Sequence, residues 1–203
     1  MELEGKIVLA SSSPRRIEMF RAHGAEPIII KPECEENLPA GIGMKDAVML
    51  LSLRKALEVE SLLRDGRAGE PGLFEKSPFI VAADTIVYHN KIIGKPLNRC
   101  HAESILEELN GTVHYVTTGV TILQAGRPLR RTFAEVSEVW FKRYSEAELS
   151  AYLDTDEPYD KAGAYAIQGA FGKYIDHIDG DYDNIVGFPW ARFEKEFALL
   201  IQK

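Results

Sequence analysis

The junction between an apolar run and a proline-led helix near the N-terminus constrains the fold of this chain most. Residues 7–10 form a short apolar run that predicts a buried strand, and Ser13 followed by Pro14 is typical of the N-cap and first turn of a helix. Arg15 and Arg16 follow in that first turn, where the partial positive charge of the helix N-terminus disfavours cations. The pattern indicates an anion site after the strand, with two solvated surface arginines as the alternative.

Strand and helix signals then alternate along the chain and predict an α/β fold. The expected strands cover residues 6–10, 27–30, 79–83, 86–88, 92–93, 113–123 and 132–141. The apolar run 79–83 is expected to end at Asp84. The expected helices cover residues 14–23, 44–63, the segment between Asn98 and Gly111, a segment opened by the capping box Ser145-x-x-Glu148, and a last helix after Pro189 with Trp190, Phe193, Phe197 and Ile201 on one face. The Gly- and Asp-rich stretch 154–187 receives no predicted element.

Composition predicts one globular domain over residues 1–203. A net charge of -7 argues against general affinity for nucleic acid or for an anionic membrane. The N-terminal apolar run is too short for a signal peptide or a membrane span. Cys34 and Cys100 form no ligand or disulfide pattern, which favours a reducing cytoplasm.

Three further features have both a chemical and a structural interpretation. Asp84 follows an apolar strand, where ligands of α/β sheets bind, although an aspartate there can also order a turn. Lys55 projects from the apolar face of the helix predicted over 44–63, and snorkelling of its aliphatic stem is the common explanation for such a lysine. Lys95 stands between Gly94 and Pro96, a weak signal for a lysine aimed at a ligand.

The acidic segment 33–36 follows another predicted strand. A carboxylate there could join Asp84 in holding a divalent cation through oxygen ligands, while a solvated acidic loop is the alternative interpretation. The chain has neither a G-x-x-x-x-G-K-[ST] loop nor a G-x-G-x-x-G fingerprint, so the commonest nucleotide-binding designs are excluded.

Five blocks follow one another along the chain: residues 9–16 (LASSSPRR), 83–85 (ADT), 94–96 (GKP), 160–169 (DKAGAYAIQG) and 180–189, which begins GDY and ends GFP. In this order, they together resemble the Maf family of nucleoside triphosphate pyrophosphatases. The resemblance implies a mixed, long curved sheet flanked by helices, with two lobes and a central cleft, as in the inosine triphosphate pyrophosphatase group. It also implies hydrolysis of a nucleoside triphosphate to the monophosphate and pyrophosphate with Mg²⁺ or Mn²⁺.

The resemblance assigns roles to individual residues. Asp84 matches the proton acceptor, and Glu36 matches a glutamate associated with the metal, which would be held by Glu36 and Asp84; Glu35 is the alternative glutamate. The matched phosphate-site positions are Ser11, Arg15, Arg16, Lys55 and Lys95.

Arg15, Thr85 and Gln168 resemble the subgroup that acts on dTTP and UTP, with CTP accepted by some members, whereas the subgroup acting on 7-methyl-GTP typically has Trp in place of Arg15. A Gln168 amide can both donate to and accept from a pyrimidine edge. Modified pyrimidine nucleotides are an alternative substrate class. A nucleotide-responsive regulator linked to septum formation and division arrest, in which turnover is incidental, is an alternative function. The resemblance also implies a homodimer.

Overall fold

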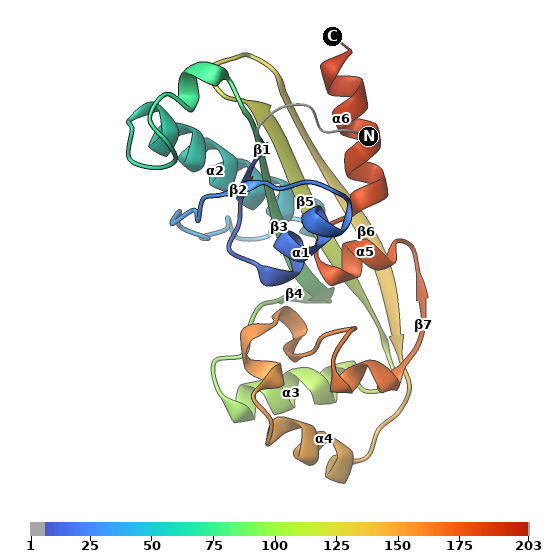
Figure 1. Cartoon of the computed structure of the whole chain (residues 1–203). Coiled ribbons are helices and arrows are strands. Elements are labelled where there is room, and N and C mark those ends of the chain that lie inside the picture. Colours follow the sequence, from blue (N-terminus) through green and yellow to red (C-terminus); the bar gives the residue numbers. More distant parts are fainter. Residues whose placement is uncertain (1–6, 203) are drawn as a thin grey trace. The chain divides into compact units, whose positions relative to one another are not determined.

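The computed structural model describes residues 7–202, whose strands form a mixed sheet with helices packed against it (Figure 1). The strands are β1 (Ile7–Ala10), β2 (Ile28–Ile29), β3 (Phe79–His89), β4 (Lys91–Ile93), β5 (Val113–Gln124), β6 (Arg130–Phe141) and β7 (Ile175–Asp179). They are hydrogen-bonded in the order β2-β1-β3-β5-β6-β7, and β4 pairs with β3. β1 runs parallel to β2 and β3, whereas the β3–β4 and β6–β7 pairs are antiparallel. The predicted α/β class is confirmed.

Every predicted helix forms, and two of them have the predicted side-chain caps. The helices are α1 (Pro14–Ala22), α2 (Met44–Arg64), α3 (Arg99–Leu109), α4 (Glu146–Leu153), α5 (Tyr182–Val186) and α6 (Trp190–Ile201), with 3₁₀ helices at Phe74–Lys76, Glu157–Asp160, Ala162–Ala164 and Ala170–Tyr174. The Asn98 side chain accepts a hydrogen bond from the His101 backbone, and Ser145 and Glu148 form a reciprocal capping box. No helix within residues 7–202 is both long and apolar enough to cross a membrane.

The described residues divide into two compact units. Unit 1 comprises residues 7–84, 118–134 and 187–202, and unit 2 comprises residues 85–117 and 135–186. Strands β3, β5 and β6 therefore contribute residues to both units. The expectation that residues 1–203 form one domain stays a prediction.

Unit 1 buries both faces of its parallel strands, because alternate residues of a strand point to opposite faces. Ile7 and Leu9 of β1 pack into an apolar cluster with residues of α1 and α6, whereas Val8 and Ala10 pack into a second cluster with residues of α2. The same alternation continues in β3, so that α2 covers one face of the sheet in this unit. This arrangement fixes the direction in which each β3 side chain points.

Unit 2 has a separate core. In it, α3, α4 and the 3₁₀ helices between residues 157 and 174 pack on β4 and on the parts of β3, β5 and β6 that belong to this unit. The Arg99 guanidinium joins the two helices, because its NH2 donates to Ser150 Oγ at 3.0 Å and to Asp154 Oδ1 at 3.0 Å. His114 lies fully buried in this core and shares a 2.7 Å hydrogen bond with the Tyr165 hydroxyl.

Three sequence expectations are wrong. β3 runs unbroken from Phe79 to His89, so Asp84 does not end its strand. The stretch 154–187 contains β7 and α5, which its glycines and aspartates concealed. Ile201 is 51% exposed, because it is the last residue of α6 and follows Leu200, the last residue of that helix in the core.

Candidate active site

Lys55 brings two of the predicted acidic residues together in unit 1. Its Nζ lies 2.5 Å from Asp84 Oδ1 and 2.7 Å from Glu36 Oε1. The Lys55 and Asp84 side chains are 14% and 11% exposed, and the Glu36 side chain is 64% exposed. One mostly buried ammonium thus holds two carboxylates, one from the sheet and one from the loop that precedes α2.

The strand pattern explains why Asp84 faces α2. Ile80 and Ala82 of β3 belong to the cluster on the α2 face, and Asp84 is the next residue with the same orientation. Ala82 pairs with Ala10, the last residue of β1, while β3 continues beyond that point. Asp84 therefore lies inside its own strand but past the carboxyl end of the neighbouring parallel strand, where ligands of α/β sheets bind.

The loop after β1 forms the second part of the site. Arg16 NH1 donates to Ser11 Oγ at 3.3 Å, and Arg16 Nε donates to the Gly187 carbonyl at 2.9 Å. Ser13 is the N-cap of α1, as predicted, but its side chain makes no capping hydrogen bond; instead its backbone N–H donates to Ser11 Oγ. Arg15 stands beside Arg16 in the first turn and is partly buried. The strand–helix junction thus presents arginines where an anion would be favoured.

Electrostatic effects connect the two parts of the site. Burial lowers the pKa of Lys55, but the Asp84 and Glu36 carboxylates together outweigh burial and raise that pKa above the ordinary lysine value. Burial lowers the pKa of the Arg16 guanidinium, and the charge of Arg15 adds to this, while Asp84 and Glu36 oppose it. Arg16 therefore lies within the electrostatic reach of both carboxylates.

Glu36 and Asp84 have suitable chemistry for a hard divalent cation. Both offer carboxylate oxygens, and both already contact one positive charge, the Lys55 ammonium. Within residues 7–202 there is no group of three or more His, Cys, Asp or Glu side chains that could hold a metal ion. Two carboxylates are nevertheless a usual protein contribution to a Mg²⁺ site that is completed by water and phosphate oxygens. Glu35, the alternative glutamate, instead accepts a hydrogen bond from Asn37.

The remaining predicted residues belong to unit 2. Thr85 directly follows Asp84 along β3 and is partly buried, while Lys95 and Gln168 are exposed. The loops that carry Lys95 and Gln168 are joined by a 3.2 Å hydrogen bond from Gly163 N to the Gly94 carbonyl. Gly163 has a φ of +74°, and a side chain there would meet Val87 at 2.8 Å, so this close approach requires glycine. A backbone hydrogen bond within unit 2 therefore joins the sequence block 94–96 to the block 160–169.

Two residues of α2 that sequence reasoning missed hold the loop of Glu36. Arg54 NH1 donates to the Asn37 carbonyl at 2.5 Å, and Glu58 Oε2 accepts from the Glu33 backbone N–H at 2.7 Å. Arg54 precedes Lys55, and Glu58 lies three positions after it. The sequence signal that could have indicated these two residues was the recurrence of charged side chains on the same side of the helix.

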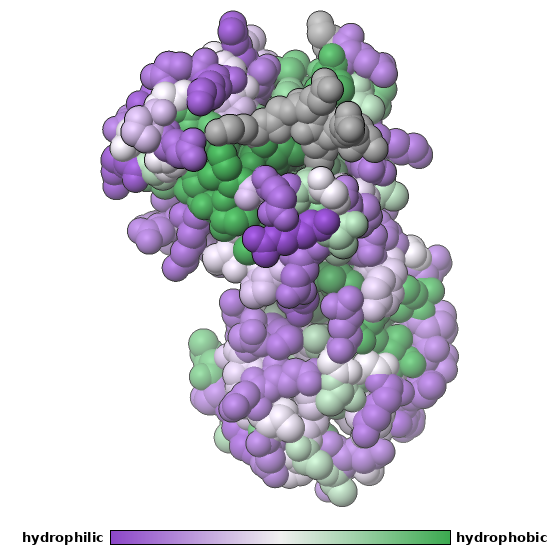
Figure 2. Space-filling view, in the orientation of Figure 1, coloured by the Kyte–Doolittle hydropathy of each residue, from purple (hydrophilic) through white to green (hydrophobic). Residues whose placement is uncertain are grey.

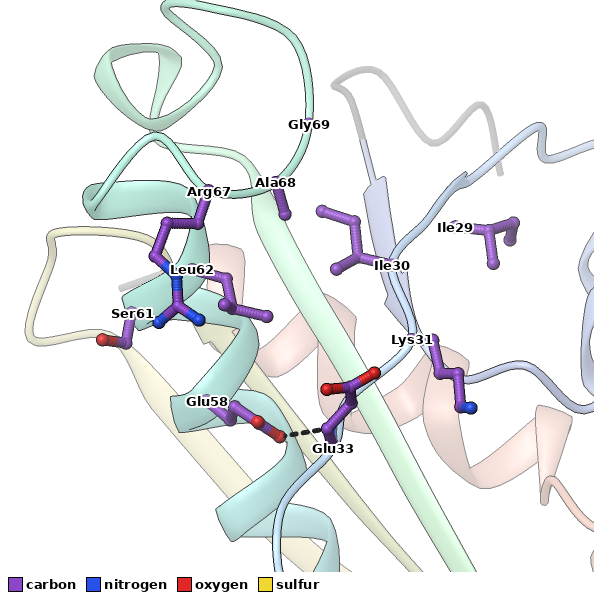
Figure 3. Close-up of a pocket in the computed structure, with 10 residues that line it drawn as sticks. All are labelled: Ile29, Ile30, Lys31, Glu33, Glu58, Ser61, Leu62, Arg67, Ala68 and Gly69. Carbon is purple, nitrogen blue, oxygen red and sulfur yellow. Dashed lines mark hydrogen bonds between the residues drawn. The ribbon is translucent and has the colours of Figure 1, made fainter.

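A hollow of about 500 Å³ lies in unit 1, and its lining residues come from β2, the start of the loop that follows it, α2 and the segment after α2 (Figure 3). Figure 2 shows apolar residues gathered over β2 and α2 in this view. The lining residues are Ile29, Ile30, Lys31, Glu33, Glu58, Ser61, Leu62, Arg67, Ala68 and Gly69. None of the residues to which the family resemblance assigns a role lines it.

Comparison with known proteins gives a match over nearly the whole chain. The family described as Maf-like protein matches residues 6–199. A protein of Bacillus anthracis named dTTP/UTP pyrophosphatase is 40% identical over 192 residues, which cover 94% of this chain and 93% of that protein. A protein of Bacillus thuringiensis subsp. konkukian with the same name is 41% identical over 193 residues, with the same coverage.

One solved structure with a low similarity is "The structure of the Staphylococcus aureus Ham1 protein". It has a TM-score of 0.43 and 12% sequence identity, and the match covers 83% of this chain and 90% of that one. This likeness is too weak to support an inference about fold or function.

Proposed function

Because the chain belongs to the Maf-like protein family, we propose that it is a nucleoside triphosphate pyrophosphatase with dTTP and UTP as substrates. The relatives named dTTP/UTP pyrophosphatase support the substrate class, since the matches span almost the full length of both chains. The observation that carries the proposal is the Lys55 ammonium between the Asp84 and Glu36 carboxylates, which also lie within electrostatic reach of Arg16 at the strand–helix junction.

The proposed reaction is attack of water on the α-phosphorus. The water oxygen bonds to the α-phosphorus, and the bond from that phosphorus to the oxygen bridging to the β-phosphorus breaks. The Asp84 carboxylate takes the water proton, and pyrophosphate leaves with the bridging oxygen. Cations are needed because negative charge develops on the phosphate oxygens and on the leaving group. Arg15, Arg16 and Lys55 supply positive charge for this purpose, and Ser11 holds the Arg16 side chain.

A divalent cation, Mg²⁺ or Mn²⁺, fits the oxygen donors of Glu36 and Asp84. When bound, it supplies charge neutralisation for the phosphate oxygens. Glu36 is preferred over Glu35 in this proposal because its carboxylate shares Lys55 with Asp84.

Residues of unit 2 are proposed to complete recognition of the nucleotide. Lys95 would contribute a further charge to the phosphates, and Thr85 and Gln168, together with Arg15, would select a pyrimidine. The exposed Gln168 amide offers both a donor and an acceptor for a base edge, which supports this role.

The proposed setting is the cytoplasm, because Cys34 and Cys100 are free thiols in the structure. The homodimer implied by the family resemblance stays a prediction, which light scattering of the purified protein would test.

The experiment that tests the function is product analysis with Mg²⁺ or Mn²⁺ on dTTP, UTP, CTP, ATP, GTP and 7-methyl-GTP. We expect monophosphate and pyrophosphate from dTTP and UTP, and loss of both products in Asp84→Asn. Turnover restricted to 7-methyl-GTP would contradict the roles of Arg15, Thr85 and Gln168. Tight nucleotide binding without turnover would instead favour a nucleotide-responsive regulator.

A further inference from the structure

The loop that carries Glu36 has no regular secondary structure. Residues 30–43 join β2 to α2 and contain neither helix nor strand. Across the described chain, residues 31–38 take part in no backbone–backbone hydrogen bond. A segment of this kind needs other contacts to offset the conformational entropy that is lost when it is ordered.

Three consecutive contacts from α2 replace the missing backbone hydrogen bonds. Glu58 accepts from the Glu33 backbone N–H, Lys55 pairs with Glu36, and Arg54 donates to the Asn37 carbonyl. As the loop advances from Glu33 to Asn37, its partners go backwards along α2, so the loop runs antiparallel to the helix. Figure 3 shows the Glu58 carboxylate directed from α2 at the backbone of Glu33.

The contacts of Glu58 and Arg54 differ from that of Lys55 in the part of the loop that they bind. Lys55 contacts the Glu36 side chain and would act on the reacting groups directly. Glu58 and Arg54 each hold a backbone group on one side of Glu36, through a hydrogen bond that has one charged partner. Glu58 also interacts with the side chain of Cys34 in the same loop. Hydrogen bonds with one charged partner are stronger than neutral ones. They are therefore suited to fixing the position of the loop without taking part in chemistry.

We propose that Arg54 and Glu58 are positioning residues that clamp the loop from Glu33 to Asn37 onto α2 and thereby hold Glu36 opposite Asp84 for the divalent cation. The inference rests on the proposed function. Groups that orient metal ligands typically contribute about 10- to 100-fold to metal affinity. Losing the clamp is expected to weaken metal binding while the reacting groups remain in place.

Glu60 provides a matched control on the same helix. Its Oε1 accepts a 2.9 Å hydrogen bond from the Gly126 backbone N–H, in the turn between β5 and β6. The Glu60→Ala variant therefore removes the same type of contact from α2 but leaves the loop of Glu36 untouched.

The test compares wild type, Glu58→Ala, Glu58→Gln, Arg54→Met and Glu60→Ala by two measurements. Hydrogen–deuterium exchange of the peptide covering residues 31–38 reports on the loop without any substrate. The Mg²⁺ concentration that gives half-maximal UTP hydrolysis reports on the metal. For Glu58→Ala we expect faster exchange in that peptide and a rise of about 10-fold in the half-saturating Mg²⁺ concentration. Arg54→Met should change both in the same direction.

The conservative variant and the control sharpen the expectation. Glu58→Gln keeps an oxygen acceptor and should recover most of the wild-type behaviour, and Glu60→Ala should match wild type in both measurements. Unchanged exchange in Glu58→Ala and Arg54→Met would overturn the clamp, whatever the activity. Faster exchange with unchanged Mg²⁺ dependence would overturn its role in metal binding. A wild-type protein that hydrolyses no nucleoside triphosphate would instead overturn the proposed function and the metal role that depends on it.

Discussion

Lys55 is the residue on which the charge balance of the site depends. Its ammonium is the group shared by Glu36 and Asp84, and its raised pKa keeps it protonated across the neutral range. Snorkelling alone does not explain this lysine, because its Nζ is directed at two carboxylates while the side chain remains mostly buried. Removing the ammonium would leave two negative charges facing each other without their shared partner.

We expect Lys55→Met to lower kcat for UTP by about 100-fold or more, the loss typical when one charge-stabilising group is removed from an active site. The apolar stem is retained, so its packing should change little. Steady-state kinetics would measure the effect, with Lys45→Met at an exposed position of α2 as the control. Equal activity of the two variants would contradict the role of Lys55.

His114 is a second residue with a marked electrostatic effect, although it lies outside the candidate site. Burial lowers its pKa from 6.5 to about 3, and the nearby His89 adds to this effect. The unfolded chain therefore takes up a proton at a higher pH than the folded chain does. The contribution of His114 to stability is full above pH 6.5 and is lost as the pH falls from 6.5 towards 3.

We expect the free energy of unfolding to fall by up to about 1.4 kcal/mol for each pH unit below 6.5 through this one group. Urea unfolding of wild type and His114→Gln at pH 7.5, 5.5 and 4.5 would measure it. The variant should be less stable at pH 7.5 but should lose less stability on acidification. Parallel pH profiles for the two proteins would exclude this role of His114.

Among the elements, α2 does most to define the candidate site, since it carries Lys55 and contacts the loop of Glu36. Its approach to the sheet depends on Gly119 of β5, because a Cβ atom there would lie 2.3 Å from the Val48 carbonyl group. Next along the helix, Ser52 Oγ shares a 3.0 Å hydrogen bond with Thr121 Oγ1, which in turn shares one with Thr132 Oγ1. The position of Lys55 is thus fixed by close backbone packing and by a chain of hydroxyl groups from Ser52 through Thr121 to the partly buried Thr132.

Gly119→Ala should destabilise the protein by about 1–3 kcal/mol, the usual cost of overpacking a core. It should also lower kcat, because α2 must move away from β5. At Gly43, the N-cap of α2, an added Cβ would meet only Asp46 Oδ2 at 3.8 Å, so Gly43→Ala is the control and should cost less than 1 kcal/mol. Urea unfolding would compare the two. Equal stabilities would show that the close approach at Gly119 is not required.

Helices with local signals were predictable, and elements that depend on distant partners were not. Caps at Asn98 and at Ser145 marked α3 and α4 correctly, because they act within one turn of sequence. β7 escaped prediction because it is short and partly exposed and lacks a continuous apolar run. Asp84 was expected to end its strand because the apolar run stops there. Its carboxylate is accommodated inside β3 by a Lys55 partner that lies 29 positions away in the sequence.

On the scale of the whole molecule, the positive charges of the candidate site stand out against an acidic chain. The chain carries 24 Lys and Arg residues against 31 Asp and Glu residues, for a net charge of -7. Figure 2 shows hydrophilic residues spread over the visible surface of both units. This balance favours a small polyanion bound locally over a long one bound along a basic surface.

The candidate site was predictable from the sequence only in part. The residue types were evident from the blocks around Arg15, Asp84 and Lys95, but the sharing of Lys55 between two carboxylates required the fold. The choice between Glu35 and Glu36 and the contacts of Arg54 and Glu58 depend on how an irregular loop lies on a helix. Such a path has no local pattern in the sequence.

The most direct test of the central claim is UTP hydrolysis in ¹⁸O-labelled water, with the products analysed by mass spectrometry. Attack on the α-phosphorus by a water that Asp84 deprotonates predicts label in UMP, unlabelled pyrophosphate, and neither product from Asp84→Asn. Label in pyrophosphate, release of inorganic phosphate as the first product, or normal turnover by Asp84→Asn would contradict the account.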